Sequence, residues 1–551
     1  EQYTKKLYRY NNSGAETFNP PSYHYNPTNG NYTLDPRGKY VLSDYNLEGA
    51  TDSYITRVNL QAFATYDRVF DGAHRVSGLL LYNQYQDNSQ ADAPAKFRGQ
   101  SLKVGYGYKD KYLIDFNGAI NGSDRFAANH RYGFFPAISF GYNIANEDYF
   151  KNNVKFIQYL KLRGSYGIVG SDAIGGSRYI YTQFYQNGTG GYSFGTNNNP
   201  VGTILEGTLA NPNVFWESQK ELNLAIESTM FDSKLGVTLE YFRNIRYNQL
   251  IIPGDVSNVI GIGVPAINAG KSLNRGFEAQ ITYQDRVGQL QFNSSLVFSY
   301  AKNKILDQRE ATPAYPYLYR TGHPIGQPFG YVFDGYYSQQ DIDKINSNAP
   351  DKPVIPVNGS KVQPGDLKYK DLNNDGKIDQ YDQKDIGLPN VPNTNVGLTL
   401  GMAYKGFSIS VLLQGAFGYS FAVVGTGVEP FKSQFQPIHQ QRWTPSTAAT
   451  AQFPSLTTDP LSVSSPSNYM SDYWLINAHY IRLKSVDLGY QFPSKLLPFH
   501  FKYARIYISA YNLFTWRNYN KYQQDPEVAT SSAGDVYPNQ RIANLGLQVT
   551  F

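Results

Sequence analysis

Apolar and polar side chains alternate strictly along many segments of the chain. In 277–284 the odd positions are apolar or aromatic, whereas the even positions are Glu278, Gln280, Thr282 and Gln284. Successive side chains of a β-strand point to opposite faces of its sheet, so this period predicts strands with one apolar and one polar face. About fifteen strands are predicted, near 53–70, 75–88, 97–108, 112–124, 132–144, 157–170, 217–231, 234–250, 272–285, 288–303, 393–404, 406–420, 480–491, 503–514 and 543–551.

The connections between these strands fall into two kinds. Some are short, at 71–74, 109–111, 231–234, 285–288 and 404–406, whereas the largest span 170–216, 306–392 and 421–479. A soluble β-sandwich also alternates, but it has no reason to collect short turns at one end and long loops at the other. Transmembrane barrels of outer membranes are built in this way, with periplasmic turns and extracellular loops. The sequence therefore predicts an all-β, antiparallel transmembrane barrel in a bacterial outer membrane.

The composition agrees with a barrel wall between lipid and water. The 551 residues include 48 Tyr, 32 Phe and 49 Gly but no Cys, and the mean hydropathy is -0.47. Aromatic girdles at both membrane interfaces are a feature of such barrels. No stretch approaches the ~18 consecutive apolar residues of a transmembrane helix. The net charge of +5 is mild and the basic residues are dispersed, so we expect no nucleic-acid partner.

Several motifs of the chain, in order, resemble those of the SusC/RagA family of TonB-dependent outer-membrane transporters of Bacteroidetes. The likeness is carried by KLRGSYG at 161–167 with Gly170, NAGK at 268–271, NRGFE at 274–278, PIG at 324–326, GY at 330–331, DG at 334–335, PGD at 364–366, DLNNDGKID at 371–379, YIRLK at 480–484, NLF at 512–514 and DPE at 525–527. Each motif alone is weak, but together they cover 157–551 in family order. Residues 1–156 add compatible strands and few motifs.

The resemblance implies a 22-stranded barrel with an N-terminal plug and a TonB-contacting segment. Counting fifteen strands back from a periplasmic C-terminus places 1–52 in an extracellular loop, with seven strands and the plug before it. We therefore expect the chain to be the C-terminal part of a longer transporter. The resemblance further implies import of an oligosaccharide, a peptide or a similar nutrient, with energy from the inner-membrane proton gradient delivered through TonB and a SusD-like surface lipoprotein as lid.

A different class of function stays open on the residues alone. A passive porin, or a barrel that serves as a scaffold for surface adhesion or secretion, would show the same alternation. Plug sequence ahead of Glu1 would distinguish a transporter from a porin. No Ser/His/Asp or paired-carboxylate arrangement can be singled out, so we expect no catalytic residues and no enzyme.

A candidate calcium loop lies in the connection 306–392. Oxygen-bearing residues occupy the spacing of an EF-hand loop, in which the seventh position offers its backbone carbonyl and a glycine at the sixth allows the sharp turn. Position 12 is aspartate instead of the usual glutamate. The alternative is a metal-free turn rich in Asp, Asn and Gly. The predicted structural Ca²⁺ ligands are Asp371, Asn373, Asp375, Lys377, Asp379 and Asp382.

Three further predictions concern the barrel. The polar alternate residues are expected to line the pore, with Arg57, Asn59, Gln61, Glu278 and Gln280 as candidates. The terminal Phe551, at the end of an alternating strand, is expected to form the barrel-assembly signal. Tryptophans near strand ends or in the long loops are expected to anchor the barrel at the outer-membrane lipid surface, with stacking on a sugar as the alternative; they are Trp216, Trp443, Trp474 and Trp516.

Overall fold

The fold was analysed in a computed structural model of the chain. The structure describes residues 23–26, 31–34, 55–89, 94–175, 178–188, 192–194, 199–358, 361–425, 429, 435–497, 500–519, 525–527 and 539–551. The predicted extracellular loop 1–52 lies outside the described residues except for a short hairpin, β1 (Tyr23–Asn26) with β2 (Asn31–Leu34).

One antiparallel sheet of fifteen strands dominates the structure. Each strand pairs with the long strand that precedes it in the chain, and β3 and β25 are the two edge strands. The strands are β3 (Ile55–Phe70), β4 (His74–Ser89), β5 (Ala95–Tyr108), β6 (Tyr112–Ser123), β7 (Tyr132–Asn143), β8 (Ile157–Ser171), β13 (Glu217–Met230), β14 (Leu235–Ile251), β15 (Ile267–Val287), β16 (Leu290–Asp307), β21 (Thr394–Tyr404), β22 (Phe407–Ala422), β23 (Leu475–Gln491), β24 (Tyr503–Arg517) and β25 (Ile542–Thr550). All fifteen predicted strands are confirmed.

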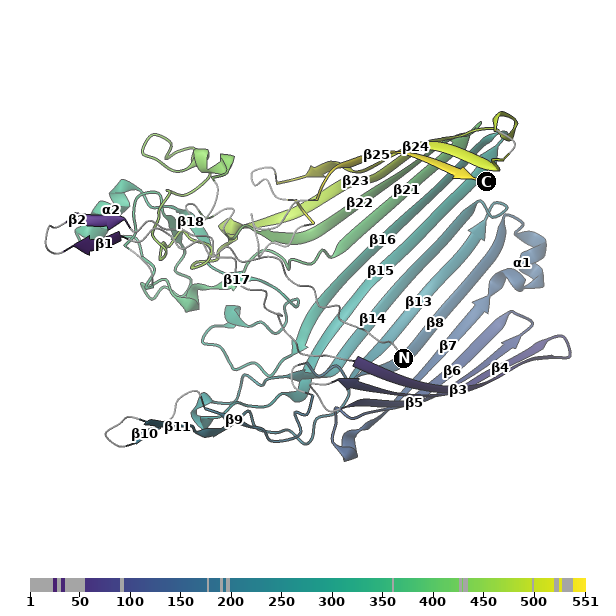
Figure 1. Ribbon diagram of the computed structural model, residues 1–551, viewed down its shortest axis with the longest axis horizontal. Helices are drawn as coiled ribbons and strands as arrows, with labels where there is room; N and C mark the ends of the chain where they lie inside the picture. Colours follow the sequence, from purple (N-terminus) through teal and green to yellow (C-terminus); the bar gives the residue numbers. More distant parts are fainter. Residues whose placement is uncertain are drawn as a thin grey trace.

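The sheet curves into a trough whose two ends differ (Figure 1). Tight turns, together with α1 (Asp148–Asn153), lie at one end, and the long connections extend from the other. The predicted sorting of short turns and long loops is therefore confirmed. Among the described residues, no helix is both long and apolar enough to cross a membrane.

The long connections contain short elements of their own. In the connections between β8 and β13 and between β16 and β21, small hairpins form alongside one capped helix. These elements are β9 (Tyr185–Asn187), β10 (Tyr192–Phe194), β11 (Asn199–Val201), β12 (Ile204–Glu206), β17 (Phe329–Gly330), β18 (Phe333–Tyr336), α2 (Gln339–Asn346), β19 (Leu367–Tyr369) and β20 (Lys384–Asp385). The 3-10 turns are η1 (Ala128–His130), η2 (Ile144–Asn146), η3 (Asn258–Ile260), η4 (Pro316–Leu318), η5 (Gln380–Asp382), η6 (Pro437–Gln441), η7 (Asp472–Trp474) and η8 (Ser494–Leu496).

The apolar face of the sheet is not covered by any described element. In register across three strands, Leu224 pairs with Tyr241, and Tyr241 pairs with Phe277. Leu224 and Phe277 remain 49% and 57% exposed. Large continuous apolar surfaces of this kind mark contact with a membrane or a partner. Because the side chains belong to long strands of a curved sheet, the covering phase is lipid, as the alternation predicted.

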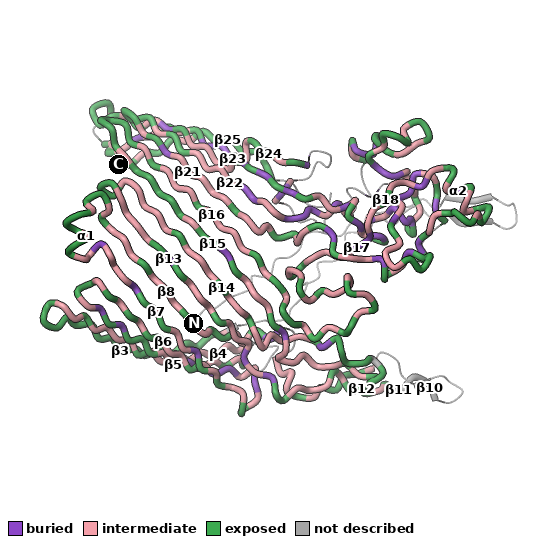
Figure 2. The backbone as a smooth tube through the Cα atoms, turned by 180° about the vertical axis from the view of Figure 1, so that it is seen from behind, coloured by how far each residue is buried: buried purple, intermediate pink, exposed green. Residues whose placement is uncertain are grey.

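The buried core lies mainly in the loops and not in the sheet. Figure 2 shows buried segments gathered around β17 and β18, whereas the strands are mostly intermediate or exposed. One cluster joins residues from 331–378, from 416–480 and Tyr519, including the loop-side ends of β22 and β23, and we call this body the loop domain. A smaller cluster around Phe126, Phe135 and Trp216 closes the base of the connection between β8 and β13. The long connections are thus packed structures.

Candidate transport path and loop domain

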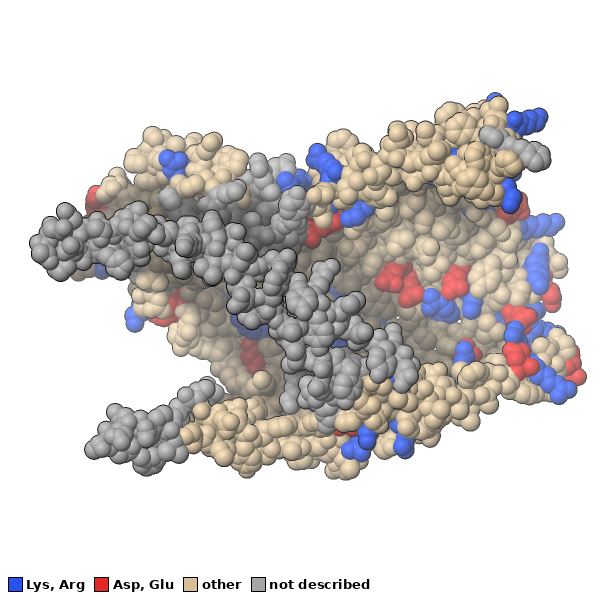
Figure 3. All heavy atoms as spheres, viewed as in Figure 1, with Lys and Arg blue, Asp and Glu red and all other residues tan. Residues whose placement is uncertain are grey.

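The polar face of the sheet carries a charged network. Arg163 donates from Nε to Glu227 at 2.7 Å, from Nη1 to Asn223 at 2.8 Å and from Nη2 to Glu240 at 2.6 Å. Asn223 also donates to Glu240. These side chains come from β8, β13 and β14, opposite the lipid-facing leucines. Figure 3 shows acidic and basic side chains next to one another in the hollow of the trough. The hollow is therefore hydrophilic.

A row of asparagines lies on the same face, nearer the long loops. Asn244 pairs in register with Asn274, and Asn274 pairs with Asn303. All three line a cavity of about 520 Å³ that also borders Pro324 and Asn393. Asn303 accepts a hydrogen bond from the Ile325 backbone N–H at 2.6 Å, which ties the loop base to the barrel wall. Amides both donate and accept, and Arg246 adds a cation to the lining, so this cavity suits a polar ligand with hydroxyl, peptide or anionic groups.

Backbone and side-chain hydrogen bonds join the two long connections of the loop domain. The Tyr331 N–H donates to the Met470 carbonyl at 2.9 Å, and the Asp472 N–H donates to the Tyr331 carbonyl at 3.1 Å. The Tyr369 hydroxyl donates to the Val463 carbonyl at 2.7 Å. Buried polar groups of one connection are thus satisfied by the other. The loop domain therefore folds as one unit above the barrel mouth.

The PGD motif at 364–366 lies at the centre of this junction. Gly365 has φ +89, and a Cβ there would lie 2.5 Å from the ring of Trp443, so only glycine fits. The Asp366 carboxylate accepts from the Gln363 N–H and the Ser464 hydroxyl, both at 2.8 Å. Burial nevertheless raises the pKa of Asp366 above its ordinary value.

The YIRLK and DPE motifs meet in space. The Arg482 side chain is 1% exposed and donates from Nη2 to both carboxylate oxygens of Asp525 at 2.8 Å. Its Nη1 lies 2.8 Å from Glu527 Oε2, an ion-pair distance without hydrogen-bond geometry. Lys484 donates to Glu527, also at 2.8 Å. Two motifs that are 43 residues apart in the chain thus form one charged cluster.

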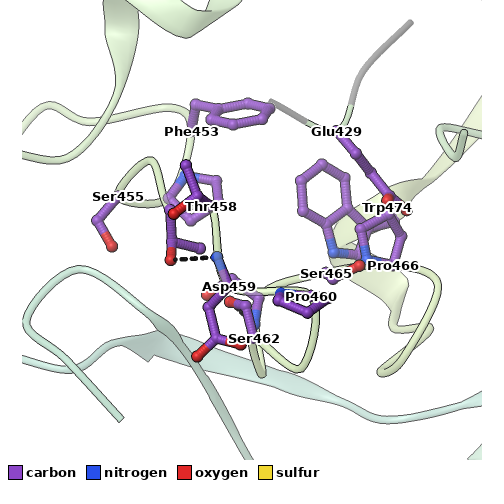
Figure 4. A pocket seen from close by; sticks show the side chains of 13 residues that line it. Glu429, Phe453, Ser455, Thr458, Asp459, Pro460, Ser462, Ser465, Pro466 and Trp474 are labelled. Atoms are coloured by element: carbon purple, nitrogen blue, oxygen red, sulfur yellow. Dashed lines mark hydrogen bonds between the residues drawn. The ribbon is translucent and has the colours of Figure 1, made fainter. Parts of the chain in front are cut away.

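A smaller cavity opens within the loop domain. Figure 4 shows the aromatic rings of Phe453 and Trp474 above the short polar side chains of Asp459 and Ser462. The two rings meet edge to face, with centroids 5.6 Å apart. The cavity volume is about 220 Å³. Ligand sites for drug-sized molecules measure roughly 300–1,000 Å³, so of the two cavities only the asparagine-lined one has the size of a small-molecule site.

The predicted calcium ligands lie in one turn, but their oxygens face backbone N–H groups. Asp371 Oδ2 accepts from the Gly376 N–H at 2.9 Å, and the Asp382 carboxylate accepts from the N–H groups of Leu372 and Asp379, both at 2.8 Å. Burial raises the pKa of Asp382. Gly376 adopts φ +80, as the predicted turn requires. Within the described ranges, no three His, Cys, Asp or Glu side chains converge on a common metal position.

One oxygen of this turn nevertheless suits a cation. Asp371 Oδ1 is buried and has no hydrogen-bond partner among the described residues. The Asn373 side chain donates to Asp375 Oδ2 at 3.0 Å and accepts from the Asp375 N–H at the same distance. Lys377 occupies the seventh position, whose backbone carbonyl is the predicted ligand, and Asp379 caps the 3-10 turn η5. The residue types therefore fit Ca²⁺, whereas the side-chain directions seen here are those of a metal-free turn.

The five pore-lining candidates all lie on the polar face. Arg57 binds Asp87 through two hydrogen bonds of 2.6 Å, and Asn59 and Gln61 follow on the same side of β3. Glu278 pairs in register with Glu240 of the charged network, and Gln280 lies two residues along β15. Contact with a transported molecule stays a prediction. Phe551 is 73% exposed and meets Phe501 with ring centroids 5.1 Å apart; its role in assembly also stays a prediction.

The tryptophan prediction is wrong for two of the four residues. Trp474 is 1% exposed in the loop domain, and Trp216 is 5% exposed against Phe126 and Phe135. Trp516 is 57% exposed on the lipid-facing side of β24, where an anchoring role fits. The prediction failed because the long connections form apolar cores, which position in the sequence does not indicate.

Comparison with known proteins places this architecture in a class. No family model matches the chain. TonB-dependent receptor P26 of Formosa agariphila is 29% identical over 477 residues, which is 82% of this chain and 45% of that protein. TonB-dependent receptor SusC of Bacteroides thetaiotaomicron is 25% identical over 82% of this chain and 43% of its own length. The chain thus spans about half the length of the curated relatives it matches.

Solved structures agree on the fold. The RagAB peptide importer in its open-open state superimposes with a TM-score of 0.71 at 18% identity, covering 91% of this chain and 55% of that chain. The RagAB peptide transporter gives 0.70, with 91% and 56% covered. The fold is therefore that of an antiparallel outer-membrane β-barrel. The resemblance to SusC-type TonB-dependent receptors, first indicated by the motifs, is confirmed, and the chain is an outer-membrane protein.

Proposed function

We propose that this chain forms the barrel wall of a SusC-like, TonB-dependent importer of polar nutrients. One observation carries the proposal: a hydrophilic trough, facing away from lipid, ends beneath a folded loop domain at the mouth of the barrel. A passive pore has no need for a loop core of this size. The asparagine-lined cavity fits an oligosaccharide or a peptide, whose hydroxyl and amide groups match its donors and acceptors. Energy would come from TonB, acting outside the described residues.

The two edge strands support the proposal that this sheet belongs to a larger, closed barrel. Unpaired backbone groups cost several kcal/mol each inside a membrane, so spanning sheets close. The edge strands β3 and β25, with 16 and 9 residues, are each long enough to cross a membrane and lie at opposite ends of the strand order. We therefore propose that further strands join them, in agreement with the 22-strand barrel that the family resemblance implies.

The loop surfaces suit a lid protein. Large apolar side chains are exposed there, including Ile204 at 74% and Val259 at 92%. Their chain neighbours Leu205 and Ile260 are exposed as well, and continuous apolar patches usually mark a contact with a partner. The proposed partner is a SusD-like surface lipoprotein that closes over the extracellular mouth.

Affinity purification of the complete protein in mild detergent should recover one lipoprotein at near-equal stoichiometry. Mass spectrometry should identify it by a lipid-modified N-terminal cysteine. Replacing Ile204 and Val259 by aspartate should lower its recovery severalfold, because both changes place charge in the contact surface. The control is Val287→Asp, a 71% exposed site at the turn end, which should leave recovery unchanged. Recovery of the barrel alone from native membranes would favour the porin alternative.

We also propose that the turn 371–382 binds Ca²⁺ and that the ion orders the surrounding connection. The proposal is supported by the EF-hand spacing, by Gly376 at a positive φ and by the unpartnered Asp371 Oδ1. Binding would redirect the carboxylates from backbone N–H groups to the ion, with oxygen distances of about 2.3–2.6 Å.

Removal of calcium by a chelator should speed proteolysis within 308–393 and leave the barrel strands protected. Asp371→Ala should produce the same sensitivity with calcium present, because it removes the first ligand. The matched control is Asp385→Ala, in the same connection but outside the predicted ligand set. Equal protection of the wild type with and without calcium would contradict the proposal and support the metal-free turn.

A further inference from the structure

Three basic residues form a row on the lipid-facing side of the sheet. Arg243 of β14 pairs in register with Arg275 of β15, and Arg275 pairs with Lys302 of β16. Two residues further towards the long loops, Lys304 of β16 pairs with Leu273 of β15. All four cations are exposed, and none has an ion-pair partner among the described residues. Two arginine guanidinium groups and two lysine ammonium groups are therefore exposed on one outer patch without a counter-ion among the described residues.

The carboxylates of the same strands cannot neutralise this row. Glu240 and Glu278 pair with each other in register, but they lie three residues from Arg243 and Arg275 and therefore on the opposite, polar face. Glu240 is further engaged by Arg163 in the trough. The positive charge on the outer face thus remains uncompensated by these residues.

The height of the row relative to the membrane follows from its neighbours. Tyr241, Phe277 and Tyr300 form the adjacent row towards the turns. Two residues along a strand span about 6.6 Å. The cations therefore lie about 6.6 Å from this aromatic row, on the side of the long loops. Aromatic rows of outer-membrane barrels mark the boundary between hydrocarbon and headgroups. Because the long loops extend from this end of the strands, the cations lie at the headgroup level of the outer leaflet.

An apolar groove lies directly beneath the basic row. It has a volume of about 550 Å³, and its apolar lining includes Leu162, Leu224, Leu239, Tyr241, Phe277 and Phe298. The small side chain of Ala279 stands in register between Leu239 and Phe298 and lowers the floor of the groove. A groove of this kind fits a hydrocarbon chain, whose contacts are apolar along its whole length.

We propose that this surface is a binding site for a phosphorylated glycolipid of the outer leaflet. Its phosphate groups would bind Arg243, Arg275 and Lys302, and one acyl chain would occupy the groove below. Arginine binds phosphate through two parallel hydrogen bonds, and the paired arginines present two such forks side by side. Charge complementarity and the outer-leaflet height select this lipid over a neutral lipid or an inner-leaflet phospholipid. The proposal does not depend on which nutrient the barrel imports.

The test is native mass spectrometry of the complete, delipidated protein in detergent, titrated with bisphosphorylated lipid A. The variant Arg243→Gln/Arg275→Gln/Lys302→Gln should bind about 10- to 100-fold more weakly, since each basic residue near a membrane surface contributes on the order of a severalfold gain in affinity for anionic lipid. The control Lys151→Gln/Lys155→Gln/Lys495→Gln removes three exposed cations elsewhere and should bind as the wild type does. The charge-conserving variant Arg243→Lys/Arg275→Lys should retain most of the binding.

Further titrations distinguish the sources of phosphate. Dephosphorylated lipid A and phosphatidylglycerol should each bind more weakly than bisphosphorylated lipid A, and millimolar inorganic phosphate should not displace it. Equal binding by the wild type and the Gln triple variant would overturn the proposal, as would an equal loss in the control variant. Equal affinity for phosphatidylglycerol, or displacement by inorganic phosphate, would overturn the assignment to a glycolipid. Uptake is not measured, so the outcome is independent of the proposed transport function.

Discussion

Replacing Arg482 by methionine is expected to destabilise the protein by about 3–5 kcal/mol, because it leaves the Asp525 carboxylate without its buried cation and Glu527 with Lys484 alone. Arg482 is 1% exposed, and its partners Asp525 and Glu527 are 13% and 17% exposed. Methionine fills similar space without the charge, so the loss reports the ion cluster more than a cavity. Urea unfolding of the complete protein, followed by its heat-sensitive migration on gels, should show an earlier midpoint.

Two further variants make this result specific. Arg286→Met removes an exposed arginine at a turn and should change stability by less than about 0.5 kcal/mol. The triple change Arg482→Met/Asp525→Asn/Glu527→Gln should recover part of the loss, since the unpaired charges are then gone. An Arg482→Met protein as stable as the wild type would show that the cluster is not an ion-pair anchor.

Trp474→Ala is expected to destabilise the loop domain by about 3–5 kcal/mol while leaving the barrel intact. The Trp474 ring is fully buried and packs against Phe453 and Tyr473, with centroid distances of 5.6 and 4.9 Å. Truncation removes this shared apolar contact and enlarges the cavity beside it. Limited proteolysis should then cut within 423–474 and 308–393, whereas the strands stay protected.

The matched control for this change is Leu461→Ala. Leu461 lies in the same connection but is 61% exposed, so its truncation should leave the protease pattern unchanged. Global unfolding of the Trp474→Ala barrel, or unchanged cleavage of its loops, would contradict the view that the loop domain folds as a separate unit above the barrel.

The barrel wall could be predicted from the sequence because its physical constraint is local. A strand between lipid and water must alternate, so Phe277, Glu278, Ala279 and Gln280 reveal both faces without knowledge of their neighbours. A short turn between two strands then requires them to be antiparallel neighbours in the sheet. The structure extends several predicted strands by a few residues, most clearly β15, which begins at Ile267.

The loop domain could not be predicted in the same way, because its contacts join residues far apart in the chain. The backbone of Tyr331 forms hydrogen bonds with Met470 and Asp472, and no alternation of apolar and polar residues in either segment indicates these contacts. The burial of Trp216 and Trp474 could not be predicted for the same reason. The charged network around Arg163 also joins separate strands, and its only signal in the sequence is the pair of acidic residues, Glu227 and Glu240, at polar positions of the two strands that follow KLRGSYG.

The central claim, energised import through this barrel, is tested most directly by uptake in living cells. Small molecules that co-purify with the complete protein are first identified by mass spectrometry, and a labelled form of the main species is then supplied. The account predicts accumulation that disappears when a protonophore collapses the inner-membrane proton gradient or when TonB is deleted, while the barrel remains at its normal level in the outer membrane. Accumulation that continues unchanged after both treatments would contradict it and identify the barrel as a passive pore.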